Sequence, residues 1–565
     1  MTRLRILLLF AAVLILLAAV WVVCVRRRPV DMAQFAPANS LIYLEANEPA
    51  EILTALAQTD VWRLFSASGN APQSSVFAGR WQSFVRQTSL GPIDSVIISR
   101  SQIAIVVTDL GATESNDTLR VKPEAALIVE THTSERRIRA PLERFLERFV
   151  IATYTTPQME RSLVDDVNFV EWRERNGPGQ LVAAFIGSVV IVGNSRRVVD
   201  TCVAVARGRA PSLTSDSDLQ RARVSHDAAS ALVFGYVPSQ QASKLVSLGM
   251  PLLLGHAPTD RQFQALFQNA ASKIIGRLTW TSRPFRGGIE DRYEIELDRD
   301  LVKELNPRFG SPKVASDTQL VTDFYSISQY HLEDPLAAWQ VLRTSISRRV
   351  DTVAAVIFNT TFRTSLSSYG IEDPEDFLAA VKSPLNTVKL DPEGERQLLV
   401  ATISDRAKLT KLFASRMRTV KRGTADPATT VLENADETLG VLLNDNLIVI
   451  GHPVDVQQYH RTAKQLPVGV NAQLTRLNQF AEPTNRAHVL TYTDDSERVK
   501  RCMTAIMRTY QRERRQLNTD MAALPYAVTQ TVVTQEGLTR ITRSPLGQFS
   551  AIIPLLIPEN DPSER

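Results

Sequence analysis

The stretch GNSRR, Gly193 to Arg197, is the sharpest candidate for chemistry in this sequence. An apolar strand pattern, VVIV, ends on Gly193 and runs into a helical pattern whose first turn carries Arg196 and Arg197. Backbone N–H groups at a helix N-terminus attract anions, and arginine donates hydrogen bonds to phosphate or carboxylate oxygens. The sequence therefore predicts a candidate anion-binding site at Asn194, Ser195, Arg196 and Arg197.

Other reactive side chains are scattered. The sequence has no GxSxG, HExxH, GxxxxGK[ST] or strand-linked GxGxxG motif, which are the patterns of common nucleophile, zinc and phosphate sites. The acidic pairs Asp165-Asp166 and Asp494-Asp495 are sequence neighbours, and neighbours on a strand point to opposite faces. We expect these pairs to serve turns and helix caps. We predict no catalytic residues, no cofactor and no metal. None of the seven histidines are spaced as a helical metal pair: His132, His226, His256, His331, His452, His460 and His488.

Three cysteines are too few for a disulfide-built scaffold. Cys24 lies in an apolar run, and Cys202 and Cys502 lie in helical patterns. Free, buried thiols are the expectation for both, and a Cys202–Cys502 bridge stays open as the alternative.

The strand and helix that carry the GNSRR turn occur twice. The segment LVAAFIGSVVIVGN from Leu181 aligns without a gap with LGVLLNDNLIVIGH from Leu439, so Gly193 falls opposite Gly451. In both segments a β-hairpin leads into a helix, with turn residues Gly187-Ser188 in one and Asn444 to Asn446 in the other. Further matches follow in the same order along the chain: Pro49 with Pro335, Thr131 with Thr402, Tyr236 with Tyr492, and Trp280 with Val533. This order predicts an internal duplication.

Each copy reads as strands joined by short turns with intervening helices. This pattern favours an α+β fold with a mixed or antiparallel sheet and helices on one side of it. We predict a first α+β copy over residues 35–300 and a second over 315–555. The segment DRDLVKELNPRFGSPK, Asp298 to Lys313, is the expected linker, and residues 556–565 are expected to be a disordered tail.

An apolar run near the start predicts a membrane anchor. Ile6 to Val25 is twenty residues without a charge, which as a helix would measure about 30 Å, the thickness of a hydrocarbon core. Arg3 and Arg5 precede the run, and three arginines follow it at 26–28. Basic residues on both sides leave the orientation open. We expect residues 1–28 to be a single-pass signal anchor that leaves the body outside the cytoplasm and close to the bilayer.

Composition excludes some classes of function. The chain has 565 residues, 44% hydrophobic and 22% charged, with a net charge of +4. This small net charge argues against a nucleic-acid partner. Two basic amphipathic helices are predicted, ERRIRAPLERFLERFV from Glu135 and ERVKRCMTAIMRTYQRERRQL from Glu497. Their apolar stripes should face the core, and contact with anionic lipid or an acidic partner is the alternative.

Several blocks resemble a known family. They are FAPANSLIYLEANEPAEILTAL after the anchor, FIGSVVIVGNSRRVVDTCVAVARG, SLTSDSDLQRAR and SALVFGYV. The chain resembles a widespread bacterial family of membrane-anchored extracytoplasmic proteins classed as a domain of unknown function. The resemblance covers most of residues 35–555. It implies an anchored, periplasmic body on the bacterial inner membrane and implies no activity and no site residues.

The predicted function is that of a non-enzymatic envelope protein. Its partners would be the bilayer, through Ile6–Val25, and a protein at the membrane surface, which the duplicated body would bind or assemble with. The alternative is a binding module for an apolar or anionic ligand in the cleft between the copies.

Overall fold

A computed structural model describes the protein over residues 29–67, 92–115, 118–254, 268–310, 324–364, 366–420, 429–464, 476, 479–481, 487–510 and 524–556. The predicted anchor, Ile6–Val25, lies outside these residues, as does the predicted tail except for Leu556. Residues 29–310 are called the first unit below and residues 324–556 the second unit.

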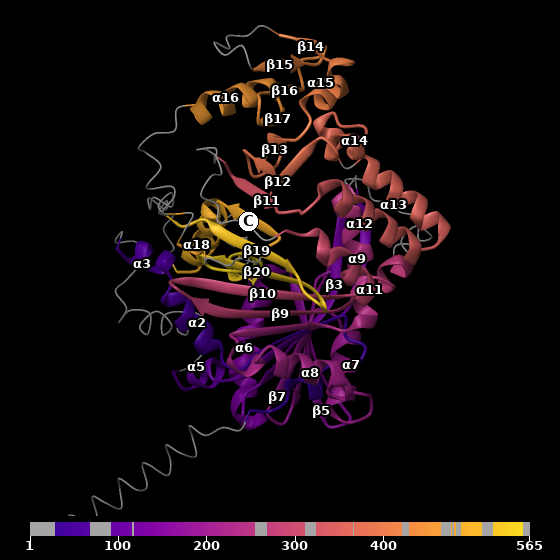
Figure 1. The fold of residues 1–565 in the computed structure, drawn as a ribbon. Helices are drawn as coiled ribbons and strands as arrows, with labels where there is room; N and C mark the ends of the chain where they lie inside the picture. Colours follow the sequence, from indigo (N-terminus) through magenta and orange to yellow (C-terminus); the bar gives the residue numbers. More distant parts are fainter. Residues whose placement is uncertain are drawn as a thin grey trace, which may run out of the picture.

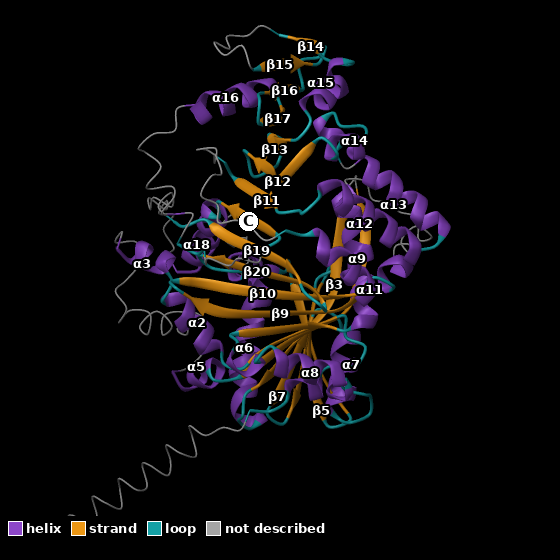
Figure 2. Ribbon diagram, in the orientation of Figure 1, coloured by secondary structure: helices purple, strands orange, loops and turns teal. Residues whose placement is uncertain are grey.

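A single antiparallel sheet of twenty strands runs through both units (Figures 1 and 2). The first unit supplies β1 (Ile42–Ala46), β2 (Gln102–Ser115), β3 (Thr118–Glu130), β4 (Pro157–Val164), β5 (Val167–Glu174), β6 (Gln180–Ile186), β7 (Val189–Gly193), β8 (Val233–Val237), β9 (Ile275–Phe285) and β10 (Gly288–Leu297). The second supplies β11 (Ser326–Tyr330), β12 (Val381–Lys389), β13 (Gln397–Ile403), β14 (Arg418–Thr419), β15 (Thr430–Glu433), β16 (Gly440–Leu443), β17 (Leu447–Gly451), β18 (Val489–Thr493), β19 (Ala527–Val533) and β20 (Gly537–Ser544). The predicted α+β class is confirmed, and every strand ladder is antiparallel.

The strand order is the same in the two units. In the first it runs β4-β5-β6-β7-β3-β2-β1-β8-β9-β10. In the second it runs β14-β15-β16-β17-β13-β12-β11-β18-β19-β20. The strands β10 and β20 pair with each other and join the units edge to edge. Figure 1 shows this seam, with β9 and β10 below β20 and β19.

The registers agree as well as the order. One row of directly paired residues in the first unit is Tyr236, Tyr43, Val106, Ala126 and Gly193. The corresponding row in the second unit is Tyr492, Ile327, Val388, Leu398 and Gly451. Both rows start at the matched tyrosines and end at the matched glycines, four ladders away.

These rows correct two matches made from the sequence. Thr402 pairs with Leu447 and so holds the place of Glu130, not of Thr131. Thr529 pairs with Thr491 in the way that Trp280 pairs with Gly235, so Trp280 matches Thr529 rather than Val533. Sequence similarity in these strands is too weak to fix a register, because a shift of a few apolar residues looks equally good.

Both matched glycines are required where a strand end lies close to its neighbours. A Cβ atom at Gly451 would lie 2.6 Å from the carbonyl oxygen of Gln397, and one at Gly193 would lie 2.7 Å from the side chain of Val199. Helices begin directly afterwards, as predicted. Ser195 caps α7 (Arg196–Ala206) by accepting a hydrogen bond from the N–H of Val198, and α16 (Pro453–Lys464) begins on a proline.

Helices cover both faces of the sheet, so the prediction of helices on one side is wrong. In the first unit α7 packs with Tyr43, Ala126 and Val182 on one face. The opposite face packs against α6 (Glu135–Thr153), through Ala183 and Trp172 among others. The strands of this region are apolar on both faces, which a one-sided alternation would not require. In the second unit α16 and α15 (Arg406–Ala414) cover opposite faces in the same way.

The remaining helices of the described residues connect or flank the strands. They are α2 (Pro49–Ala57), α3 (Asp60–Ala67), α5 (Pro92–Ser99), α8 (Ser217–Ser225), α9 (Ser239–Leu254), α11 (Arg299–Leu305), α12 (Pro335–Arg349), α13 (Thr352–Thr364), α14 (Pro374–Leu378), α18 (Ser496–Tyr510) and α19 (Phe549–Leu556). Short 3₁₀ turns lie at Met32–Phe35, Leu213–Ser215, Ala228–Ser230, Asn306–Arg308 and Ser367–Tyr369. The predicted linker from Asp298 is therefore helical over much of its length, because Asp298 caps α11 and Leu301, Val302 and Leu305 are buried.

Candidate functional site

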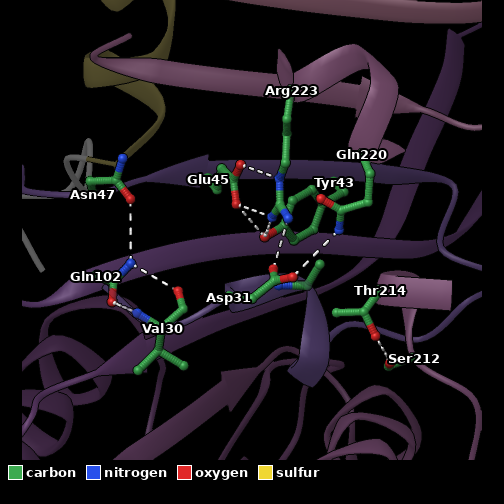
Figure 3. A network of polar contacts seen from close by, with 11 residues as sticks. Val30, Asp31, Tyr43, Glu45, Asn47, Gln102, Ser212, Thr214, Gln220 and Arg223 are labelled. Atoms are coloured by element: carbon green, nitrogen blue, oxygen red, sulfur yellow. Dashed lines mark hydrogen bonds and ion pairs between the residues drawn. The ribbon is translucent and has the colours of Figure 1, made fainter. Parts of the chain in front are cut away.

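A network of polar contacts in the first unit surrounds Arg223 of α8 (Figure 3). Its guanidinium group donates to both carboxylate oxygens of Glu45, at 2.9 and 2.5 Å, and to Asp31 at 2.8 Å. The hydroxyl of Tyr43 donates to Glu45 at 2.7 Å and accepts from Arg223 at 3.3 Å. The Arg223 side chain is 16% exposed and that of Glu45 is 14% exposed, so these charges are held in a largely dry site.

Three separate segments place these groups. Tyr43 and Glu45 are two residues apart on β1 and therefore face the same side of the sheet. Asp31 precedes the 3₁₀ turn at Met32 and caps it by accepting from the N–H of Ala33. Arg223 lies in the last turn of α8, where a positive charge is favoured by the helix dipole. The cluster therefore ties the start of the described chain to the sheet and to α8.

A second contact holds the same N-terminal segment, at Val30. The side-chain amide of Gln102, at the start of β2, accepts from the N–H of Val30 at 2.7 Å and donates to its carbonyl oxygen at 3.1 Å. It also donates to Asn47. Gln102 is buried, so this two-sided pairing replaces water for the backbone of Val30. The chain is thus held at two successive residues, Val30 and Asp31.

The electrostatics of the cluster keep Tyr43 neutral and Arg223 protonated. Burial raises the pKa of Tyr43 well above its ordinary value, and the Glu45 carboxylate raises it further, so the phenol keeps its proton and donates it. Burial alone would lower the pKa of Arg223, but its hydrogen bonds to Glu45 outweigh that effect and leave the pKa raised. No nucleophile with an adjacent base is formed here. The arrangement joins three segments of the chain through charge-assisted hydrogen bonds.

Sequence reasoning did not single out Asp31, Glu45 or Arg223. Their positions are far apart in the chain, and charged residues of these types are common on surfaces. The one available signal was Glu45 itself, a carboxylate on the same face as Tyr43 in an otherwise apolar strand, IYLEA.

The four residues of the predicted anion site do lie together, but each contacts the chain itself. Asn194 accepts from the N–H of Ala125 and donates to the carbonyl oxygen of Pro123, and Ser195 caps α7. Arg196 lies 3.8 Å over the ring of Phe169 and donates to Asp200. Arg197 donates to Glu124 through Nε and Nη2, at 2.8 and 2.5 Å. An anion would have to compete with these partners, and its binding stays a prediction.

The Arg197–Glu124 pair has a counterpart of opposite sign. Counting from the matched glycines, Asp455 of α16 holds the place of Arg197, and Arg396 beside β13 holds the place of Glu124. Arg396 donates to Asp455 at 2.5 Å through Nη2 and at 3.4 Å through Nε. An ion pair thus joins the first turn of the helix to the neighbouring strand in both units, with its charges exchanged.

Other predicted groups have ordinary roles. Asp165 and Asp166 form the turn between β4 and β5, with φ values of 51° and 58°. Asp494 caps the turn before α18 by accepting from the N–H of Ser496. Cys202 and Cys502 are free and buried, which settles the open pairing in favour of free thiols, and burial raises both pKa values to about 12. Within the described residues, no group of three or more His, Cys, Asp or Glu side chains could hold a metal ion.

A hollow of about 600 Å³ lies between α11 of the first unit and α12 of the second. It is lined by three basic and three acidic side chains: Asp298, Asp300, Lys303, Glu304, Arg348 and Arg349. Arg349 already donates to Asp298, at 2.7 Å. This lining is neither apolar nor of one sign, so it does not distinguish a ligand class for the predicted cleft.

Comparison with known proteins yields no match to a family model, a curated protein or a solved structure. The resemblance to the anchored bacterial family therefore stays a prediction. Across the part of the chain that the structure describes, none of the helices combines the length and the apolar character needed to cross a membrane.

Proposed function

We propose that this protein is a single-pass, membrane-anchored envelope protein whose extracytoplasmic body serves interaction or assembly rather than catalysis. The anchor would be Ile6–Val25, followed by the basic residues 26–28. The body would hold a fixed orientation over the outer face of the bacterial inner membrane.

The observation that carries this proposal is that Gln102 and Arg223 hold Val30 and Asp31 against the body by hydrogen bonds. Four residues separate Val25 from Val30, and even a fully extended chain spans only about 3.5 Å per residue. A body held at Val30 and Asp31 by Gln102 and Arg223 would therefore stay within roughly 20 Å of the end of the anchor. A flexible linker would need no such buried ion cluster. The cluster suits a protein whose body must keep one orientation relative to the membrane.

We further propose that the two units arose by internal duplication. Identical strand order and matching registers support this origin, and so does the pairing of β10 with β20. Arg292 and Ile541 hold the same place in their units and pair with each other, as a two-fold axis through the seam requires. A duplicated body offers two related surfaces to partners, which suits assembly.

Substituted-cysteine labelling tests the orientation. The positions are Val224, 83% exposed on α8, and Val353, 59% exposed on α13, each changed to cysteine in full-length protein with Cys24 replaced by serine. Cys202 and Cys502 are buried and provide the unlabelled background. A membrane-impermeant maleimide should label both variants in intact cells. Labelling only after lysis, or recovery of the protein in the soluble fraction, would contradict the proposal.

A further inference from the structure

The strand β4 leaves a long edge of the sheet open. Among the described residues it pairs only with β5, through eight residue pairs from Pro157 to Val164. The strand at the opposite end of the sheet, β14, has only two residues. Protein sheets usually protect their edges by keeping edge strands short, as β14 does. The edge at β4 is the exception.

The turn geometry identifies which backbone groups face outward. Asp165 and Asp166 make a two-residue turn with positive φ angles, so the flanking pair Val164 and Val167 is hydrogen-bonded. Hydrogen-bonded pairs alternate with non-hydrogen-bonded pairs along the ladder. Leu163, Arg161 and Met159 therefore direct their N–H and C=O groups away from β5. Pro157, which has no N–H, ends this usable edge.

The outward-facing residues also carry exposed apolar side chains. Met159 is 42% exposed and Leu163 is 66% exposed. They lie on the α6 side of the sheet with Arg161, whose guanidinium donates to Glu143 of α6 at 3.2 Å. Apolar side chains beside free backbone groups are the features by which a strand edge recruits another strand.

We propose that β4 pairs with β4 of a second copy of this chain, extending the sheet across a two-fold axis. The proposal rests on the assembly function above and names the partner. The chain already joins two such sheets by antiparallel edge pairing, at β10 and β20, symmetric about Arg292 and Ile541. The β4 pair would repeat this geometry between molecules. Because the same edge serves both copies, the assembly closes as a dimer.

The register of the pairing follows from the side chains. With Arg161 on the axis, Met159 of each copy lies opposite the partner's Leu163, and these apolar side chains cover each other twice. Glu160 lies opposite the partner's Ser162, which avoids like charges. The two Arg161 side chains meet on the axis, but each already has the Glu143 carboxylate beside it. Head-to-tail pairing of β4 with β14 would need a longer second edge than two residues.

Disulfide cross-linking tests this register. In full-length protein with Cys24→Ser, the double variant Glu160→Cys/Ser162→Cys places two pairs of cysteines at non-hydrogen-bonded positions across the axis. Their Cα atoms would be about 4.5 Å apart, within disulfide reach. The single variants are matched controls. In each of them the new cysteine lies diagonal to the same cysteine of the partner copy, about 7–8 Å away, which is beyond easy disulfide reach. Oxidised in native membranes, the double variant should give at least ten times more dimer than either single.

Every outcome of this experiment is informative. No dimer from the double variant, or equal dimer from the singles, overturns the pairing, and so does a cross-link to a protein of different mass. A chain that sediments with membranes but does not cross-link leaves the proposed function standing. A chain found in the soluble fraction refutes the anchored function separately.

A proline substitution provides an independent test. Arg161→Pro removes an outward N–H without removing a hydrogen bond to β5, whereas Arg161→Ala removes the charge and keeps that N–H. Sedimentation of full-length protein in detergent should show Arg161→Pro at half the mass of wild type and Arg161→Ala at the wild-type mass. Equal masses for all three proteins would overturn the proposal.

Discussion

The first turns of α7 and α16 hold the same ion pair with its charges exchanged. In the first unit Arg197 lies on α7 and Glu124 lies on β3, and the Arg197 side chain is 67% exposed. In the second unit Asp455 lies on the helix and is 3% exposed, with Arg396 as its partner. From this exchange we infer that the two positions are coupled to each other. The contact forms with the arginine on the helix or on the strand side, so neither Arg197 nor Arg396 by itself indicates a binding site.

The Arg223 cluster shows the opposite behaviour, because the matching β-strand positions that the structure describes in the second unit do not repeat it. Ile327 holds the place of Tyr43, and Gln329 holds the place of Glu45. Gln329 is 1% exposed, and neither of its amide atoms has a hydrogen-bond partner among the described residues. The charged cluster therefore belongs to the unit that receives the N-terminal segment. The two units therefore have the same strand arrangement, but the charged cluster is found in the first unit.

The largest expected effect comes from Arg223→Ala. The substitution leaves Glu45, whose side chain is only 14% exposed, without its guanidinium partner, and it also removes the partner of the more exposed Asp31. Breaking such a pair typically costs about 3–5 kcal/mol in unfolding free energy. Urea unfolding of the full chain in detergent measures the loss. The matched substitution in the second unit, Gln329→Leu, removes a buried amide and should be neutral or stabilising. Equal losses from both variants would show that the cluster is not special to the first unit.

A second contrast lies at the seam and predicts a pH dependence. Asp291 of β10 is fully buried and accepts from the indole N–H of Trp280 and the N–H of Gln548, each at 2.9 Å. Burial raises its pKa to about 6, although these hydrogen bonds oppose the shift. At the matching position of β20 the second unit has an exposed residue, Arg540.

The raised pKa of Asp291 means that the folded protein binds this proton more tightly than the unfolded chain does. The resulting stability is fully present below pH 3.8, the ordinary pKa, and is lost as the pH rises through about 6. Two pKa units correspond to about 3 kcal/mol. Relative to Asp291→Asn, the wild type should therefore lose about that much unfolding free energy between pH 4 and pH 8. If the unfolding free energies of the two proteins changed with pH in parallel, the prediction would be wrong. The matched control is Arg540→Gln, which should change the pH dependence of the unfolding free energy little.

The ion pairs at the two helices should differ in strength. Arg396→Ala leaves the buried Asp455 without its partner, so we expect a loss of about 2–3 kcal/mol, reduced by the favourable helix dipole. Glu124→Ala removes half of an exposed pair and should cost less than about 1 kcal/mol. Differential scanning calorimetry of both variants gives the comparison. A larger loss from Glu124→Ala would mean that exposure does not set the strength of these pairs.

The amino-acid pattern was sufficient to predict the repeated hairpin-and-helix element. Gly193 and Gly451, the turn at Gly187 and the cap at Ser195 are local signals, because each depends on a backbone conformation that few residues tolerate. The helix predicted from Glu135 to Val150 also followed from its apolar stripe, and in the structure it continues to Thr153. Strand registers did not follow, as the displaced match of Trp280 shows, since apolar strands align almost equally well at several offsets.

The cluster at Arg223 could not be predicted because it depends on tertiary contact. Asp31, Glu45 and Arg223 belong to a cap, a strand and a helix end, and nothing in their spacing relates them. The anion-site hypothesis failed to anticipate Glu124 for the same reason: the carboxylate that contacts Arg197 comes from the middle of another strand, β3. Local patterns show where a charge lies, whereas only the assembled sheet shows which charge opposes it.

The smallest expected effect is the most direct test of the coupled positions. The double variant Glu124→Arg/Arg197→Asp gives the first unit the charge order of the second. Each single variant places like charges together and should lose about 0.5–1 kcal/mol of unfolding free energy, a typical value for exposed pairs. The double variant should regain this loss and gain a few tenths of a kcal/mol more, because an aspartate in the first turn of α7 is favoured by the helix dipole. A double-mutant cycle from urea unfolding measures the coupling. If the two single losses simply add, the exchanged charges of the two units are unrelated substitutions, and the contact between helix and strand is held by packing alone.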